Sequence, residues 1–277
     1  MSEKISVIMS VYNESKEYVE QSLDSLLKQT YKNIEILVTV DNPKNYKVIE
    51  YLTAQSLNDQ RVIILENEKN LGLPKSLNRA LKVATGSYVA RMDADDISKK
   101  NRLYSQLSFL KREGLDLVAS NVLDIDETGK LLGTGTEYPT IPSKIYKYLR
   151  YGDCLPHPTW LGKRKVFESL EGYRDIAACE DYDFILRGRL AGFNYGVIEK
   201  PLLYYRINTQ GISQTNSMKQ VLTSYILQDA YKKGKTCSLE QINTFLANNY
   251  EESESISKTF YLIYKKYLNK ILRNIIK

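Results

Sequence analysis

Cysteine and histidine are scarce in this chain, and their scarcity excludes two kinds of stabilised scaffold. Among 277 residues there are three cysteines, which lie far apart, and a single histidine. Because no Cys-x-x-Cys pair occurs, neither a disulfide framework nor a thiolate zinc site is indicated. This cysteine usage fits a reducing cytoplasm best.

Long apolar runs are missing as well. A helix that spans a bilayer needs about 20 predominantly apolar residues, and no stretch of the sequence approaches that length. The short apolar run from Ile5 to Val11 contains two serines and leads directly into Tyr12-Asn13-Glu14, whereas a signal peptide needs a longer apolar core. We therefore expect a cytoplasmic protein that is soluble or peripheral on the inner face of the cell membrane.

Positive charge is concentrated near one end of the chain. Residues 255–277 hold six of the 39 basic side chains and no acidic one, so residues 1–254 carry 33 of each sign. Within 256–277, apolar residues recur at helical spacing with lysines between them. This pattern predicts either an interfacial helix on anionic lipid or a helix docked on the protein body or on the second subunit of a homodimer. Nucleic-acid binding is not expected, because no recognition motif accompanies the charge.

The first 120 residues alternate between strand-like and helix-like segments. Five short β-rich runs occur, at residues 5–11, 34–40, 61–65, 87–92 and 115–119. Helical spacing or helix-boundary residues mark the segments between them, at 17–28, 46–57, 74–86 and 98–112. Apolar strands between helices indicate an α/β fold with a mostly parallel sheet covered by helices.

The rest of the chain has a weaker pattern. Residues 120–215 are less regular, with helices expected near 164–170 and 181–191. From about residue 216 onward the pattern is helical. We therefore expect a catalytic domain over residues 1–215 and a helical C-terminal extension over 216–277.

Polar clusters follow three of the predicted strands at their carboxyl ends. These clusters are Tyr12-Asn13-Glu14, Asp41-Asn42 and Asp93-Ala94-Asp95-Asp96. Ligands of open parallel sheets bind outside the carboxyl ends of the strands. The three clusters are therefore expected to meet at one rim of the sheet.

The acidic run is the most informative of the three clusters. Asp93 and Asp95 are alternate residues, so in extended chain they can face one ligand together. Neighbouring carboxylates repel unless a cation neutralises them, and a hard ion such as Mg²⁺ or Mn²⁺ commonly bridges carboxylates to substrate phosphates. The alternative is a solvated acidic turn that caps the following helix. A phosphatase of the haloacid dehalogenase kind fits less well, because its Asp-x-Asp motif follows the first strand.

Several segments in order resemble the family 2 glycosyltransferases with the GT-A fold. They are Ile5–Asn13, Gln29–Glu35, Asn70–Gly72, Gly86–Asp96 and Glu180–Asp183. The resemblance covers roughly residues 4–210. One departure is that Val40 precedes Asp41 where many members have a second acid, and Asn42-Pro43 replaces a Gly-Ser turn.

The resemblance implies roles for individual residues. The implied metal ligands for Mn²⁺ or Mg²⁺ are Asp95, Asp93 and Asp96. The implied contacts to the nucleotide sugar are Val11, Tyr12, Asn13, Glu14, Asp41, Asn70, Arg91, Asp93, Ala94 and Asp95.

Glu180-Asp181 forms a second acidic pair, at the start of a predicted helix. The resemblance implies that Asp181 is the catalytic base, which takes the proton of an acceptor hydroxyl, an effect worth about 10²–10⁴ in rate. The alternative is that acids at a helix start only stabilise the helix, by about 0.3–1 kcal/mol. Asp183 fits this alternative or a structural role.

Three further residues are candidates for contacts with acceptor or phosphate: His157, Glu180 and Arg206. His157 lies between two prolines, so the alternative for it is a packed turn residue. Arg206 matches phosphate geometry, with a surface position on a final strand as the alternative. Trp160 is expected in the core rather than as a sugar platform.

These observations together predict an inverting, metal-dependent glycosyltransferase. The expected donor is a nucleotide sugar, a UDP-sugar, and the expected acceptor is a glycan or a lipid-linked saccharide in surface polysaccharide synthesis. Two alternatives remain, a nucleotidyltransferase that makes an activated sugar and a non-catalytic module that binds sugar nucleotides. A nucleotidyltransferase would carry a Gly-rich basic loop where this chain has Tyr12-Asn13-Glu14.

Overall fold

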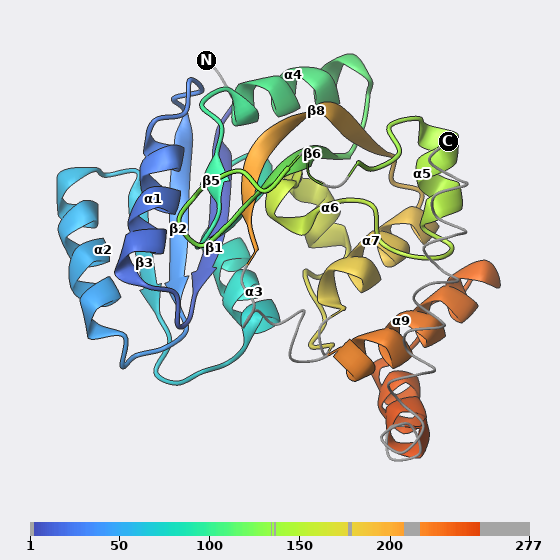
Figure 1. The fold of residues 1–277 in the computed structure, drawn as a ribbon. Helices are drawn as coiled ribbons and strands as arrows, with labels where there is room; N and C mark the ends of the chain where they lie inside the picture. The colour runs from blue at the N-terminus through green and yellow to red at the C-terminus, as the bar shows by residue number, and fades with distance from the viewer. Residues whose placement is uncertain (1–2, 134, 136, 177–178, 208–216, 250–277) are drawn as a thin grey trace. The chain divides into compact units, whose positions relative to one another are not determined.

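The computed structural model describes residues 3–133, 135, 137–176, 179–207 and 217–249, and all structural statements concern these residues (Figure 1). The amphipathic segment 256–277 lies outside them. Within the described part, no helix is both long enough and apolar enough to cross a bilayer.

Eight strands of the described residues form one mixed sheet in the order β3-β2-β1-β4-β7-β6-β8-β5. The strands are β1 (Ile5–Val11), β2 (Ile34–Val40), β3 (Val62–Glu66), β4 (Tyr88–Asp93), β5 (Ile97–Ser98), β6 (Leu117–Ile125), β7 (Leu161–Lys163) and β8 (Tyr195–Arg206). Strands β3, β2, β1 and β4 are parallel, whereas β7 runs antiparallel to both β4 and β6. The predicted α/β fold is confirmed. The sheet, which was expected to be mostly parallel, is mixed, because β7 and β5 pair antiparallel with their neighbours.

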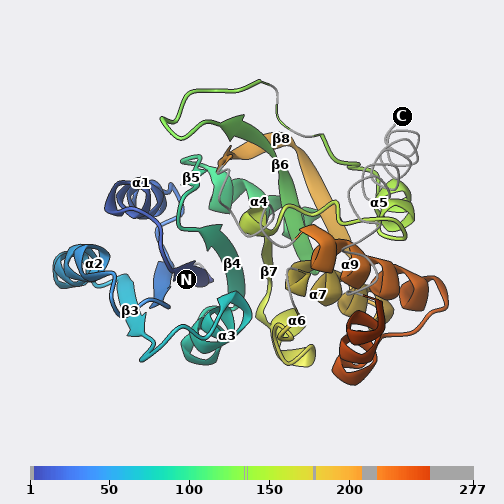
Figure 2. The same cartoon turned by 60° about the horizontal axis from the view of Figure 1, so that its bottom comes forward.

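Helices cover both faces of the sheet. Their bounds are α1 (Lys16–Leu27), α2 (Tyr46–Asn58), α3 (Leu73–Val83), α4 (Arg102–Arg112) and α6 (Arg164–Ser169). Figure 2 shows α1 and α2 on one side of β1 to β4 and α3 on the other. Alternate residues of a strand point to opposite faces, so Val7 and Met9 join α1, α2 and α4 in one core cluster while Ile8, equally buried, lies outside it.

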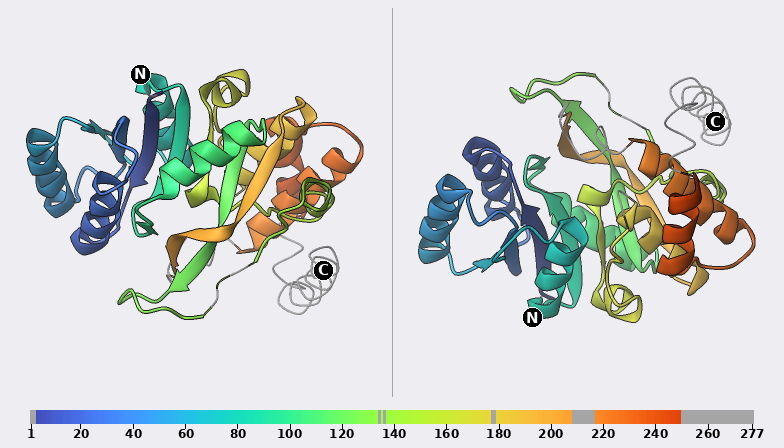
Figure 3. Two further views of the ribbon diagram at one scale, coloured as in Figure 1. Left: turned by 90° about the horizontal axis from the view of Figure 1, so that it is seen from above. Right: turned by 90° about the horizontal axis from the view of Figure 1, so that it is seen from below.

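Two predicted boundaries shift for tertiary reasons. The helix expected over 98–112 begins only at Arg102, because Ile97 and Ser98 form β5 and pair with Tyr204 and Leu203 of β8. The fifth predicted strand, 115–119, extends to Ile125 because β8 lies beside it along its whole length (Figure 3). Neither pairing has a local signal in the sequence.

Strand β8 changes register halfway along. Ser120 pairs with Ile198, but Val122 pairs with Leu203, so extra residues on β8 bulge out around Pro201. A proline lacks the N–H that a ladder needs and is tolerated in a strand at such a bulge. Beyond the bulge, β8 pairs with both β6 and β5 and ends at Arg206.

The chain divides into two compact units, which interleave along the sequence. The sheet unit comprises residues 1–137, 155–173 and 194–207, and the second unit comprises 138–154, 174–193 and 208–277. In the second unit, α5 (Pro142–Tyr148), α7 (Glu180–Leu190), α9 (Ser217–Lys232) and helical residues 239–249 supply the regular structure. A functional division at residue 215 stays a prediction, since the compact units follow a different partition.

Candidate active site

The three polar clusters meet at one rim of the sheet, as the strand order requires. Val11 pairs with Val40 and Ser10 pairs with Asp93, so β1, β2 and β4 end side by side. The backbone N–H of Asp41 donates to the Val11 carbonyl at 2.7 Å. Val11 and Ala94 are buried in the core, so their contribution to the rim is confined to their backbone.

A hollow of 390 Å³ lies at the ends of β1 and β2. Its lining residues come from both strand ends and from the helices that follow: Asn13, Glu14, Ser15, Lys16, Glu17, Asn42, Lys44, Asn45 and Lys47. Asn42 Nδ2 donates to Asn13 Oδ1 at 2.7 Å and thereby joins the two walls. Burial raises the pKa of Glu14, whose carboxylate accepts the Tyr12 N–H at 2.6 Å. The hollow is therefore polar and could hold a nucleoside.

Asp41 is buried beside this hollow and organises the loop that leads into α3. Asp41 Oδ1 accepts from Asn67 Nδ2 at 2.7 Å and from the Leu71 N–H at 2.8 Å, and Oδ2 accepts from the Gly72 N–H at 2.8 Å. Asn70 is exposed, and its Oδ1 also accepts from Gly72 N–H. The Asp41 carboxylate thus accepts three hydrogen bonds from the loop between β3 and α3.

The acidic turn brings three carboxylates together. Oxygen atoms of Asp93, Asp95 and Asp96 all lie within 4.8 Å of one another. Burial, with the charges of Asp93 and Glu14 adding to it, raises the pKa of Asp95 to about 7. Burial and both neighbours also raise the pKa of Asp96. Such mutual repulsion is what a hard divalent cation with oxygen ligands relieves, so this donor set fits Mg²⁺ or Mn²⁺.

The three aspartates are not equivalent. Asp93 and Asp95 are partly exposed, whereas Asp96 is fully buried and its Oδ1 accepts the Arg206 N–H at 2.8 Å. Asp93 and Asp95 are therefore the better placed ligands, and Asp96 has one oxygen committed to the protein. Metal ligation by any of them stays a prediction.

Arg91 supports the turn from within β4. Its guanidinium, 2% exposed, forms an ion pair with Asp93, and the backbone N–H of Arg91 donates to the Trp160 carbonyl at 2.9 Å. Nε of Arg91 has no hydrogen-bond partner in the described part of the protein. A cation held this deep compensates part of the negative charge of the turn.

His157 lies in an aromatic cluster behind Arg91. Its Nε2 is 2.9 Å from the hydroxyl of Tyr173, and its ring centroid is 4.4 Å from that of Trp160. Burial, and secondarily the charge of Arg91, lowers the pKa of His157, so the imidazole is neutral. The bonds of this residue are those of a packed core histidine, and Trp160 is buried as expected. A contact from His157 to acceptor or phosphate stays a prediction.

The second acidic pair lies in the other compact unit, on the first turn of α7. Glu180 is buried, and Asp181 is partly exposed and accepts the Tyr182 N–H at 2.7 Å. Asp183 is buried with the guanidinium groups of Arg174 and Arg187, at 2.9 and 2.7 Å from its Oδ2. Asp183 therefore anchors α7, as expected, while Asp181 keeps access to solvent.

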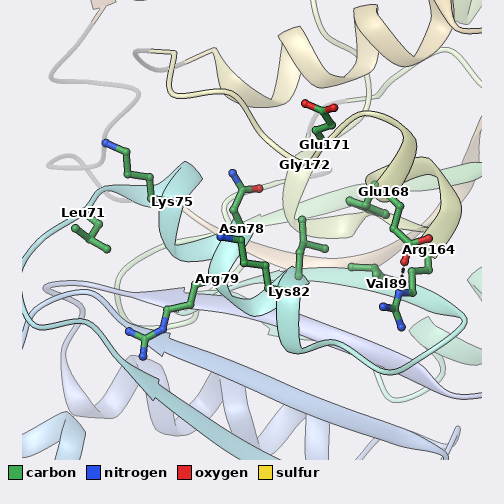
Figure 4. A pocket seen from close by; sticks show the side chains of 12 residues that line it. Leu71, Lys75, Asn78, Arg79, Lys82, Val89, Arg164, Glu168, Glu171 and Gly172 are labelled. Atoms are coloured by element: carbon green, nitrogen blue, oxygen red, sulfur yellow. Dashed lines mark hydrogen bonds and ion pairs between the residues drawn. The ribbon is translucent and has the colours of Figure 1, made fainter.

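A larger pocket, of 670 Å³, lies between α3 and α6 (Figure 4). Charged side chains from both helices line it, among them Lys75, Arg79, Lys82, Arg164 and Glu168. The sequence gives no signal for this pocket, because its walls come from two segments, 71–89 and 164–172, that lie far apart along the chain. We assign the chemistry to the rim rather than to this pocket, because the acidic turn follows β4 at the rim, beside the ends of β1 and β2.

Comparison with known proteins shows the family. The sequence pattern of glycosyl transferase family 2 matches residues 6–170. The O-antigen biosynthesis glycosyltransferase WbnJ of Escherichia coli is 32% identical to this chain, and the match covers 83% of this chain and 89% of WbnJ. The amylovoran biosynthesis glycosyltransferase AmsE of Erwinia amylovora is 29% identical, over 82% of this chain and 86% of AmsE.

Solved structures agree on the fold. TarS of S. aureus superposes with a TM-score of 0.66 at 20% identity, covering 92% of this chain and 73% of that chain. The mannosyltransferase PcManGT of Pyrobaculum calidifontis superposes with a TM-score of 0.61 at 17% identity, over 95% of this chain and 73% of that chain. The predicted GT-A fold is confirmed. Because the family pattern matches residues 6–170 and WbnJ is 32% identical over most of both chains, this chain belongs to glycosyl transferase family 2.

Proposed function

We propose that this protein is an inverting, metal-dependent glycosyltransferase that transfers a sugar from a UDP-sugar to a glycan or lipid-linked saccharide. The observation that carries the proposal is the meeting of the acidic turn, Asp93 to Asp96, with the polar ends of β1 and β2 at one rim. A nucleoside in the hollow would place its diphosphate toward the turn. A bound nucleotide sugar would contact both the acidic turn and the polar hollow. An acidic turn with a purely structural role would not require the hollow beside it.

Similarity to solved complexes supports a nucleotide diphosphate sugar as donor. TarS has been solved with UDP and with UDP-GlcNAc, and PcManGT with GDP-Man and Mn²⁺. We propose a UDP-sugar, with Tyr12, Asn13, Glu14 and Asn70 beside the nucleoside.

Asp93 and Asp95 would hold the cation, and Arg91 would reinforce them. A bound divalent cation neutralises charge that develops on the leaving diphosphate. The residues of this chain bind and orient the donor around that charge, and the buried Arg91 supplies a fixed positive charge beside Asp93.

Asp181 is our proposal for the catalytic base. Its carboxylate would accept the proton of the acceptor hydroxyl as the hydroxyl oxygen attacks the anomeric carbon. The bond from that carbon to the diphosphate oxygen breaks on the opposite side, which inverts the configuration. A base at this point is worth about 10²–10⁴ in rate. Glu180, buried beside it, is proposed to shape the acceptor side.

The acceptor belongs to polysaccharide assembly in this proposal. The names of WbnJ and AmsE place those two relatives in O-antigen and amylovoran biosynthesis. We propose action in the cytoplasm, at the inner face of the cell membrane, where lipid-linked acceptors are accessible. The basic segment 256–277 would serve there as a membrane contact or as a homodimer contact.

One experiment separates this proposal from its alternatives. The protein is incubated with a panel of nucleotide sugars and Mn²⁺, and binding and slow release of the nucleotide are measured. A glycosyltransferase binds one or a few donors and hydrolyses them slowly, a non-catalytic module binds without turnover, and a nucleotidyltransferase consumes a nucleoside triphosphate and a sugar phosphate. Asp181→Asn should abolish transfer and leave donor binding intact. Absence of any response to the panel would contradict the proposal.

A further inference from the structure

The side chain of Arg206, the last residue of β8, is buried directly behind the acidic turn. Arg206 is 2% exposed. Its N–H donates to Asp96 Oδ1 at 2.8 Å, and its Nε donates to the Asp95 carbonyl at 2.8 Å. One residue thus holds two consecutive members of the turn, one through its backbone and one through its side chain.

The rest of the guanidinium binds to two other segments. Nη1 donates to the carbonyls of Asp126 and Glu127 at 3.0 and 2.9 Å, just after β6, and Nη2 donates to Gln21 Oε1 at 2.8 Å on α1. The ring of Tyr18, one helical turn before Gln21, lies 4.3 Å from the guanidinium carbon. The Tyr18 hydroxyl in turn donates to the Glu127 carbonyl at 3.2 Å.

All acceptors of the guanidinium are neutral. Its partners are three backbone carbonyls and an amide oxygen, and the carboxylate of Asp96 is reached only by the backbone N–H. The planar guanidinium, with five N–H donors, can reach three segments of the chain at once. The ammonium of a lysine is a compact charge with three donors and would not span them in the same way. A diphosphate could bind Arg206 only if some of these hydrogen bonds were exchanged.

We propose that Arg206 is a positioning residue, which fixes the acidic turn so that Asp93 and Asp95 converge on the cation. Three carboxylates within 4.8 Å repel one another, and a turn without this anchor would relax by moving them apart. The bulge at Pro201 brings the end of β8 to the turn, and Gln21 and Tyr18 act on the turn through Arg206. This inference rests on the proposed function, since it assigns a role in cation binding.

The test measures Mn²⁺ affinity without nucleotide, by electron paramagnetic resonance of free Mn²⁺, together with thermal unfolding. Arg206→Lys keeps the charge and loses the fork. We expect it to weaken Mn²⁺ binding by about 10–100-fold, the usual effect of removing an outer partner of metal ligands. Arg61→Lys is the matched control, because Arg61 binds Asp59 and the Leu27 carbonyl at the start of β3, and it should leave Mn²⁺ affinity unchanged.

A double-mutant cycle separates positioning from phosphate binding. As a single substitution, Gln21→Ala should weaken Mn²⁺ binding severalfold. Added to Arg206→Lys, it should have no further effect, because the effects of residues that act through one another are not additive. If Arg206→Lys keeps the Mn²⁺ affinity and weakens only UDP binding, Arg206 is a phosphate contact and the inference is overturned.

Three further outcomes are also informative. If Arg206→Lys does not fold, Gln21→Ala and Tyr18→Leu decide the question, and unchanged Mn²⁺ affinity in both overturns the inference. If the natural protein itself binds neither Mn²⁺ nor UDP, the proposed function fails and the inference fails with it. If the natural protein binds Mn²⁺ and the variants bind it equally, only the positioning role is lost.

Discussion

Asp41 offers the sharpest test of how the nucleoside side of the rim is built. In Asp41→Asn one carboxylate oxygen becomes an NH₂ group, which can donate but not accept. If the amide oxygen keeps the place of Oδ1, the bonds from Asn67 and Leu71 survive and the bond from the Gly72 N–H is lost. The opposite orientation loses the other two bonds.

The expected cost follows from these hydrogen bonds. A hydrogen bond to a charged group contributes about 1.5–3 kcal/mol, and the Gly72 N–H keeps a second acceptor, Asn70 Oδ1, when the bond to Asp41 is lost. We therefore expect Asp41→Asn to lower the free energy of unfolding by about 1.5–3 kcal/mol and to weaken UDP binding, because the loop before α3 loses its anchor. Urea denaturation and titration calorimetry with UDP and with uridine measure the two effects.

The control is Asp59→Asn, which lies just before the amino end of β3 and so at the other end of the strands from the rim. Asp59 makes a part-exposed ion pair with Arg61, and surface pairs of this kind contribute about 0–1 kcal/mol. If Asp41→Asn unfolds like the natural protein yet no longer binds uridine, Asp41 contacts the base directly, as the family resemblance implies. That result would refute the reasoning that its main role is to hold the loop.

Further predictions concern stability and cation binding. Hydrogen bonds from Lys4, Ser6 and Thr85 outweigh the effect of burial and lower the pKa of Glu35 from 4.5 to about 2. The contribution of Glu35, at most about 3 kcal/mol, is therefore present above pH 4.5 and lost as the pH falls toward 2. Urea denaturation should show that Glu35→Gln has a lower free energy of unfolding than the natural protein at pH 7, and that this difference is smaller at pH 3. An equal difference at both pH values would contradict this linkage. In Gly86→Ala the new Cβ would lie 2.7 Å from the Lys4 carbonyl and from Ser6 N; we expect a loss of about 1–3 kcal/mol, and an unchanged melting temperature would show that the strands can separate. Asp95→Asn should weaken Mn²⁺ binding at least about tenfold while thermal unfolding stays close to that of the natural protein, and equal affinity would remove Asp95 as a ligand.

The strand pattern placed the three polar clusters at one rim of the sheet for a physical reason. Strands such as Ile34–Val40 are buried on both faces, so their apolar runs are visible locally. A polar cluster directly after such a run must lie at the edge of the sheet. The position of Asp93 to Asp96 at that edge was therefore predictable from the sequence.

The bonding of individual side chains was not predictable in the same way. The surface alternative for Arg206 was wrong, because Arg206 lies buried among residues 79 to 185 positions away along the chain, and its contact with phosphate stays a prediction. Asp96 resembles its neighbours in sequence but has one oxygen held by β8. The sequence around His157 did not indicate that its hydrogen-bond partner is Tyr173.

The sequence by itself determined the strands of the parallel half, their helices, the rim on which the polar clusters lie and the family, because each depends on residues near one another along the chain. Only the tertiary structure decided which of those polar side chains stay partly exposed and which are buried and hydrogen-bonded within the protein. Burial and hydrogen-bond partners come from segments such as β8, whose path past β6 and β5 is set by long-range pairing. Asp93 and Asp95 are therefore left as the partly exposed carboxylates, while Asp41, Asp96 and Arg206 are engaged in the framework behind them.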